Sequence, residues 1–155
     1  MKDDEVRFDG MTIYGNVYIR GGGTNSVIFS KIVKSAAIFT LQKTYGDKPV
    51  GLKLDNKTAQ ALKGALYIRQ NGAEVVGLES GNGTYLKQIV VDTDKLTTLD
   101  DLQADRVEIV AANADVKITA STIVKELYVT DKGYGRIDLS GTIGKLQADN
   151  NVTVK

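Results

Sequence analysis

The sequence contains no cysteine, which excludes disulfides, thiolate metal ligands and thiol nucleophiles. It contains no histidine either, so a Ser-His-Asp triad, a histidine-ligated zinc and an imidazole general base are excluded. The net charge of +1 gives no overall field that favours nucleic acid or an anionic membrane. No apolar run approaches the roughly 18 residues of a membrane span, and the acidic residues 1–5 do not open a signal peptide. These absences predict a domain without catalysis, cofactor or membrane span.

Helix-forming patterns are also scarce, whereas residues typical of strands are abundant. Val, Ile and Thr together make up 42 of the 155 residues, a composition that favours a pleated, packed surface. Sixteen glycines and a single proline, Pro49, indicate many tight corners. Only residues 57–63 resemble a helix, of two turns at most. An α/β fold would need helical patterns between the strands, and it is therefore disfavoured.

The chain repeats itself. Residues 15–23 align without a gap with residues 64–72 at an offset of 49, and both segments carry the same Tyr-Ile-Arg core. The alignment continues, with Val27 and Phe29 matching Val76 and Leu78. A recurring supersecondary unit of this kind is the sequence signature of a repeat architecture.

Apolar pairs separated by one residue give the period, which is clearest in the C-terminal half. The first series of pairs expected to point inward is Val17/Ile19, Ala36/Ile38, Leu66/Ile68, Ile89/Val91, Val107/Ile109, Leu127/Val129 and Leu146/Ala148. The second series is Val27/Phe29, Leu52/Leu54, Val76/Leu78, a pair within 96–99, Val116/Ile118, Ile137/Leu139 and Val152/Val154. A single apolar residue precedes the first series at Ile13, Ile32, Leu62, Tyr85 or Leu86, Ile123 and Ile143.

Strands that alternate for three to five residues and recur about every 20 residues can bury an inner face only by stacking turn on turn. We therefore predict one all-β domain over residues 1–155, a single-stranded parallel β-helix of about seven turns. A β-sandwich also fits the strand spacing, but it does not explain the repeated register. The variable turn length favours a right-handed coil. An expanded loop is expected over 41–62, and an N-terminal cap over 1–10.

Outward positions of the first series suggest a candidate binding face. The central residue of each inward pair must point outward, which places Tyr18, Tyr67 and Tyr128 on one face, with Ala37, Val90, Glu108 and Gln147 on the other turns. Flat tyrosines could stack on sugar rings, with Arg20 and Arg69 as a polar rim. The alternative is that the tyrosines only stabilise the sheet through neighbouring pairs.

Two other motifs are interpreted as turns. The run Gly21-Gly22-Gly23 follows a strand, but no helix comes after it, so a phosphate-binding loop is disfavoured. Asp92, Asp94 and the pair at 100–101 resemble fragments of a calcium loop, yet the rest of that loop is missing. No metal site is therefore predicted.

The segment from Val17 to Ile32, with its Gly-Gly-Gly-x-Asn-Ser-aliphatic pattern, resembles β-helical segments of secreted Gram-positive surface proteins, such as S-layer-associated proteins. It is more distantly similar to the tapirin-type cellulose-binding adhesins. The resemblance implies an extracellular or cell-surface location and a structural or adhesive role, and it names no ligand.

Three functions follow as hypotheses. The leading one is a non-catalytic structural or adhesive solenoid of a cell surface, in contact with cell wall, polysaccharide or neighbouring domains of its own chain. The second is a carbohydrate-binding module that uses the tyrosine face. The third, a β-helical polysaccharide lyase or hydrolase, is disfavoured because such enzymes build clefts from long loops. The strand at 151–155 ends abruptly, so end-to-end self-association is also expected.

Overall fold

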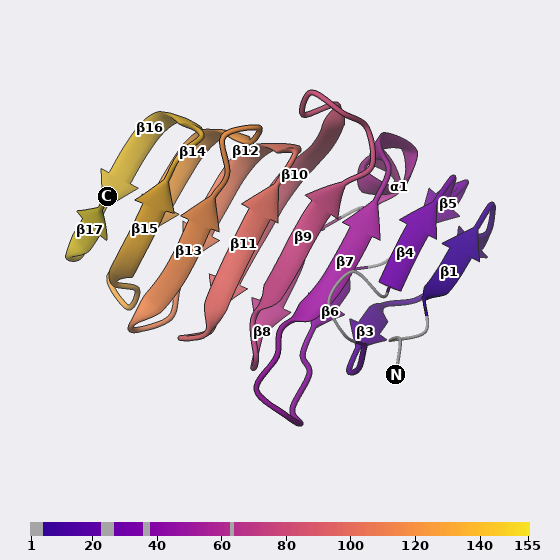
Figure 1. Ribbon diagram of the computed structural model, residues 1–155, viewed down its shortest axis with the longest axis horizontal. Helices are drawn as coiled ribbons and strands as arrows, with labels where there is room; N and C mark the ends of the chain where they lie inside the picture. Colours follow the sequence, from indigo (N-terminus) through magenta and orange to yellow (C-terminus); the bar gives the residue numbers. More distant parts are fainter. Residues whose placement is uncertain (1–4, 23–26, 36–37, 63) are drawn as a thin grey trace.

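The computed structural model describes residues 5–22, 27–35, 38–62 and 64–155 of the chain. Its strands form two large sheets that lie face to face (Figure 1). The eight-stranded sheet contains, in spatial order, β1 (Val6–Asp9), β4 (Val27–Ser30), β7 (Val50–Leu54), β9 (Ala73–Gly77), β11 (Leu96–Asp100), β13 (Ala114–Ile118), β15 (Gly135–Leu139) and β17 (Val152–Val154). The seven-stranded sheet contains β3 (Val17–Ile19), β6 (Phe39–Leu41), β8 (Leu66–Arg69), β10 (Thr84–Asp92), β12 (Leu102–Ile109), β14 (Ile123–Val129) and β16 (Thr142–Ala148).

The chain alternates between the two sheets, and each strand lies beside its equivalent in the next turn. All the pairings within the sheets are parallel, as between β10 and β12. A short third sheet pairs β2 (Thr12–Ile13) with β5 (Lys34–Ser35) near the N-terminal end. The result is a β-solenoid of about seven turns of about 21 residues, which confirms the predicted fold.

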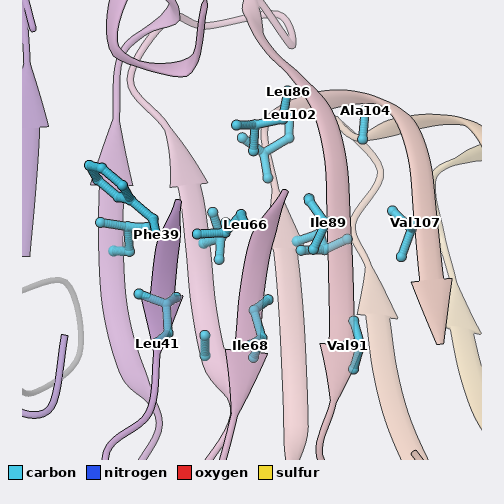
Figure 2. Packing of buried hydrophobic residues seen from close by; sticks show 14 of the residues in the cluster. Phe39, Leu41, Leu66, Ile68, Leu86, Ile89, Val91, Leu102, Ala104 and Val107 are labelled. Atoms are coloured by element: carbon cyan, nitrogen blue, oxygen red, sulfur yellow. The ribbon is translucent and has the colours of Figure 1, made fainter. Parts of the chain in front are cut away.

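The core is a set of continuous apolar columns between the sheets (Figure 2). Strands alternate their side chains, so every second residue points inward and meets the equivalent residue of the next turn. In the seven-stranded sheet one column runs through Val17, Phe39, Leu66, Ile89, Val107, Leu127 and Leu146, and the next through Ile19, Leu41, Ile68, Val91, Ile109, Val129 and Ala148. Stacking thus buries the faces that no single strand could bury alone.

Two of the expected inward pairs are in the wrong register. The second turn uses Phe39 and Leu41 instead of Ala36 and Ile38; Ile38 is exposed, and Ala36 and Ala37 lie outside the described residues. The fourth turn of the other sheet uses Val75 instead of Val76, and Leu78 is exposed. The reason is that the turns differ in length, so that an offset of 49 holds from Val17 to Leu66 but becomes 48 from Val27 to Val75.

Among the single apolar residues, one alternative is decided and one prediction is wrong. Leu86, and not Tyr85, points inward, and its column continues through Ala104 and Val124 to Ile143, so Val124 replaces the predicted Ile123. Leu146 occupies its predicted column, but it is 44% exposed because no strand covers β16 on its outer edge among the described residues. Val154, which is the neighbour of Ile137, is exposed for the same reason.

Most of the segment 41–62, expected as an expanded loop, is ordered into regular elements. It contains β7 and the helix α1 (Asn56–Ala61), and only the loop at 42–49 extends away from the sheets (Figure 1). Asp55 caps α1 by accepting the Thr58 N–H, and its other carboxylate oxygen accepts the Lys31 N–H at 2.8 Å. Burial raises the pKa of Asp55, but these hydrogen bonds outweigh it and hold the pKa below its ordinary value.

Residues 1–4 of the expected N-terminal cap lie outside the described residues, and residues 5–10 form no separate cap. Residues 6–9 are β1, which continues the eight-stranded sheet by pairing with β4. Gly22 and Gly72 have positive φ values of 98° and 78°, and Gly72 follows a turn at Gln70 and Asn71, whereas Gly23 of the predicted glycine turn lies outside the described residues. A Cβ on Gly72 would lie 2.3 Å from the Leu96 carbonyl oxygen, so this corner requires glycine for space as well as for φ.

Candidate functional site

The outer face of the seven-stranded sheet carries the predicted tyrosines. The column of outward residues runs through Tyr18, Thr40, Tyr67, Val90, Glu108, Tyr128 and Gln147. Thr40 thus takes the place expected for Ala37. With strands about 4.8 Å apart, Tyr18 and Tyr67 are separated by about 10 Å, and Tyr67 and Tyr128 by about 14 Å. The three tyrosines therefore share one face without touching each other.

Each of these tyrosines has an arginine over its ring. The guanidinium carbons of Arg20 and Arg69 lie 5.7 and 5.5 Å from the ring centroids of Tyr18 and Tyr67. Each arginine therefore contacts the tyrosine that precedes it by two residues in the sequence. A cation over an exposed ring contributes about 0.5–1 kcal/mol, and it occupies one of the two ring faces.

Tyr128 is paired with an arginine that the sequence did not indicate. Arg106, on the neighbouring strand β12, places its guanidinium carbon 4.8 Å from the centroid of the Tyr128 ring. Arg106 and Tyr128 are diagonal neighbours on adjacent strands, whereas Arg20 and Arg69 follow their tyrosines by two residues in the sequence. The Tyr128 hydroxyl also donates to Asp149, and this hydrogen bond raises the pKa of Tyr128.

The tyrosines also stabilise the sheet. Thr40 and Val90 point outward, yet both are buried, because each has a tyrosine on an adjacent strand. Neighbouring pairs of this type contribute roughly 0.2–1 kcal/mol each. A structural role and a binding role for the tyrosines are therefore compatible.

Between the tyrosines lies a network of polar side chains that connects three turns. The Gln88 amide donates to the Glu108 carboxylate at 3.0 Å, and the Arg106 guanidinium lies 3.9 Å from Glu108 and 3.5 Å from Glu126. On the N-terminal side Arg69 contacts Asp92 at 3.6 Å. These pairs balance positive and negative charge along the face, so the face suits an uncharged ligand better than a polyanion.

A second cluster, centred on Tyr85, was missed by the sequence analysis. The Lys125 ammonium lies 3.0 Å from Asp105, 3.5 Å from the Tyr85 hydroxyl and 5.1 Å from the centre of the Tyr85 ring. Hydrogen bonds from Tyr85 and Lys125 lower the pKa of Asp105, and the hydrogen bonds that Lys125 makes with Asp105 and Tyr85 raise the pKa of Lys125. The sequence does not show that Tyr85 points outward, because Tyr85 and its neighbour Leu86 both fit the position of the single apolar residue.

Shallow cavities adjoin both groups of residues. Ala59 and Gln60 of α1 form a cavity of about 270 Å³ with Tyr85 and Lys87. A polar cavity of about 300 Å³ is lined by residues that include Arg69 and Asp92. Both are open to solvent and are small for a drug-sized molecule.

The carboxylates considered as calcium ligands have structural partners. Besides the Asp92 ion pair, Asp100 accepts the Thr119 hydroxyl at 2.7 Å, and Asp101 accepts the Asn82 N–H at 2.7 Å. In the part of the chain that the structure describes, no group of three or more Asp and Glu side chains is arranged to hold a metal ion. These aspartates fix corners between turns.

Comparisons with protein family models, with curated proteins and with solved structures find no match to this chain. Among the described residues no helix is long and apolar enough to cross a membrane. The residues themselves thus carry the functional argument.

Proposed function

We propose that the chain is a non-catalytic structural and adhesive solenoid of a cell surface, which presents the outer face of the seven-stranded sheet to an extended polymer. The observation that carries this proposal is the continuity of that face. Its outward residues keep one register over seven strands, or about 29 Å between the outer strands. A rigid, continuous face of this kind favours an extended ligand over a small substrate, which would need an enclosed cleft.

The resemblance to Gram-positive surface proteins supports the choice of location. We propose that the chain is extracellular and contacts the cell wall or neighbouring domains. The test is sedimentation of the purified chain with isolated Gram-positive cell walls. Depletion of the protein from the supernatant supports adhesion, whereas full recovery of soluble protein at every wall concentration would overturn it.

A second candidate, carbohydrate binding through the tyrosines, is favoured by the three Tyr–Arg pairs on one face. Aromatic rings beside hydrogen-bonding cations are suited to hydroxyl-rich, uncharged rings. The experiment is a pull-down on insoluble polysaccharides with a triple variant, Tyr18→Ala, Tyr67→Ala and Tyr128→Ala. A matched control changes three residues of one outward column on the opposite sheet, Glu74→Ala, Lys117→Ala and Asp138→Ala.

Loss of binding in the tyrosine variant, with binding retained in the control, would assign the polysaccharide to the tyrosine face. Equal loss in both would mean that binding depends on fold stability and not on the tyrosines. Wall binding that persists in the tyrosine variant would support adhesion by another surface. Release of sugar fragments during the incubation would overturn the non-catalytic proposal and favour a lyase or hydrolase.

A further inference from the structure

The chain contains two Asn-Gly pairs, Asn71-Gly72 and Asn82-Gly83, and the fold gives them different surroundings. In such a pair the glycine nitrogen can attack the side-chain amide carbon of the asparagine, because glycine has no Cβ to hinder the approach. The attack leads to loss of the amide nitrogen and needs neither an enzyme nor a cofactor. In a folded protein its rate depends on how firmly the asparagine side chain and the following peptide group are held.

Asn71 is held firmly. Its side-chain amide nitrogen donates to the carbonyls of Tyr45 and Gly46 at 3.0 and 2.7 Å. Gly72 is buried, and the space that a Cβ would need there is filled by the backbone of the next turn. Both hydrogen bonds of the Asn71 amide must therefore break before its side chain can turn toward the nitrogen of Gly72.

Asn82 is held only at its backbone. It lies in the turn at 80–83, between β9 and β10, and the following Gly83 is exposed to solvent. Among the described residues no hydrogen bond holds the Asn82 side-chain amide, whereas the backbone N–H donates to the Asp101 carboxylate at 2.7 Å. Glycines stand on both sides, and a Cβ on Gly81 would meet no atom within 4 Å. The Asn82 side chain and the peptide group after it can therefore reorient while the rest of the corner stays folded.

We propose that Asn82 is a site of spontaneous deamidation in the folded chain. The Gly83 nitrogen bonds to the Asn82 Cγ, the Cγ–Nδ2 bond breaks, and the leaving nitrogen takes the proton of the Gly83 N–H and departs as ammonia. Water then opens the five-membered imide that remains. Attack of water at Cγ gives an aspartate, and attack at the main-chain carbonyl gives an isoaspartate, in which the main chain runs through Cγ. This modification goes beyond the proposed surface function, since it requires neither a ligand nor a partner.

The new carboxylate forms in a corner that two acidic side chains already organise. Asp101 accepts the Asn82 N–H, and Glu79 accepts the Asn56 N–H at 2.8 Å and the Thr84 hydroxyl at 2.7 Å. A further negative charge beside these carboxylates is repelled by them. The isoaspartate also adds one carbon to the main chain. We therefore expect deamidation to loosen the corner between β9 and β10.

The test is incubation of the folded 155-residue chain at mildly alkaline pH, followed by peptide mapping with mass spectrometry. We expect a gain of one mass unit and an isoaspartate at Asn82. Asn71 should convert at least about tenfold more slowly, because opening two ordinary hydrogen bonds lowers the reactive population by roughly that factor. In denaturing urea the two pairs should convert at similar rates. Equal rates in the folded chain, or no conversion at Asn82, would overturn the proposal.

Two variants control the chemistry. Asn82→Gln keeps an amide but cannot form the five-membered imide, so the mass gain at this site should disappear. Gln70 has a φ of 61° in this fold, close to the 56° of Asn82, so the backbone accepts glutamine. The matched variant Asn71→Gln should leave the conversion rate of Asn82 unchanged. Persistent conversion in Asn82→Gln would show that the mass gain arises elsewhere and would overturn the assignment.

Hydrogen exchange tests the effect on the corner. We expect residues 79–84 to exchange faster in Asn82→Asp than in the native chain, because the variant adds the charge alone. The incubated chain, which also contains isoaspartate, should exchange faster still. An incubated chain that exchanges like the fresh one would overturn the loosening of the corner, while the mass gain decides the modification itself.

Discussion

In the seven-stranded sheet the strands from β10 to β16 are seven to nine residues long, and equivalent core positions recur after 18, 20 and 19 residues. In the same sheet the strands from β3 to β8 have three or four residues, and the interval is 22 and then 27 residues. The extra residues of the N-terminal half form the loop at 42–49 and the helix α1.

The two halves also differ in what fills the interior. In the N-terminal half Phe8 stacks on Phe29 at 4.8 Å, and Phe29 meets the edge of Phe39 at 4.9 Å between ring centroids. In the C-terminal half the columns contain mainly Val, Leu and Ile. The comparison indicates that a solenoid tolerates turns of different length when larger side chains and a helix fill the added space, at the cost of shorter strands.

The largest expected effect is in the regular half. Ile109→Asp would bury an unpaired charge in a column that is almost fully shielded from water, which costs several kcal/mol. We expect the variant to lose the cooperative urea transition of the native chain. Its matched control, Glu108→Gln, alters the adjacent outward residue and should change the free energy of unfolding by less than about 1 kcal/mol. A native-like transition for Ile109→Asp would contradict the inward register.

Phe39→Ala tests the irregular half. Phe39 is fully buried, and truncation of a buried Phe costs about 3–5 kcal/mol. Because each turn contacts only its neighbours, we expect hydrogen exchange to accelerate first in β3, β6 and β8, while β12 and β14 keep their protection. Uniform acceleration over both halves would show that the solenoid unfolds as one unit and that the two regions are not energetically distinct.

The same contrast explains how far the sequence could predict the fold. In the C-terminal half the period is nearly constant, so Val107/Ile109 and Leu127/Val129 are predicted correctly from spacing alone. In the N-terminal half the change of turn length could not be located, because Ile38 and Phe39 are both apolar and either could begin an inward pair. With Phe39 inward, its ring packs against Phe29 of the opposite sheet, a contact that the spacing of apolar residues does not reveal.

For a similar reason the sequence predicts some contacts of the candidate site and misses others. Tyr18 lies in β3 and Arg20 directly follows this strand, so their contact follows from the alternation of side chains along the chain. The contacts of Tyr128 with Arg106 and of Tyr85 with Lys125 join residues of different turns. They depend on the register between strands, which only the three-dimensional structure provides.

A smaller effect is expected at Asp55, which joins α1 to the preceding turn. Asp55→Ala removes the acceptor for the N–H groups of Thr58 and Lys31 and should cost about 1–2 kcal/mol. Because the folded protein lowers the pKa of this carboxyl, its charged form contributes stability above the ordinary value of 3.8, and that contribution is lost as the pH falls through the lowered pKa.

Asp55→Asn is the control that separates the contribution of the carboxylate charge to stability from that of the helix cap. It keeps a neutral acceptor, so the stability difference between the native chain and this variant should be present at pH 7 and vanish at the acid end of a urea titration series. A difference that is independent of pH would mean that the carboxylate charge does not contribute.

The smallest effect is expected in the loop at 42–49. Hydrogen bonds fix residues 43–46 of this loop. The Lys43 ammonium donates to the Gly22 carbonyl at 3.0 Å, and the Asn71 amide donates to the carbonyls of Tyr45 and Gly46. Insertion of four Gly and Ser residues after Asp47 should therefore cost less than about 1 kcal/mol, since closure entropy grows slowly with loop length.

The matched insertion after Ala112 falls in a corner of the regular half. There the Tyr134 N–H donates to Ala111 and the Ala114 N–H donates to Tyr134, so the corner is bonded directly to the next turn. We expect this insertion to lower the urea midpoint more than the insertion after Asp47, because it separates Ala111 from Ala114 and disrupts both hydrogen bonds. Equal midpoints for the two insertions would show that the regular half tolerates added length as readily as the irregular half.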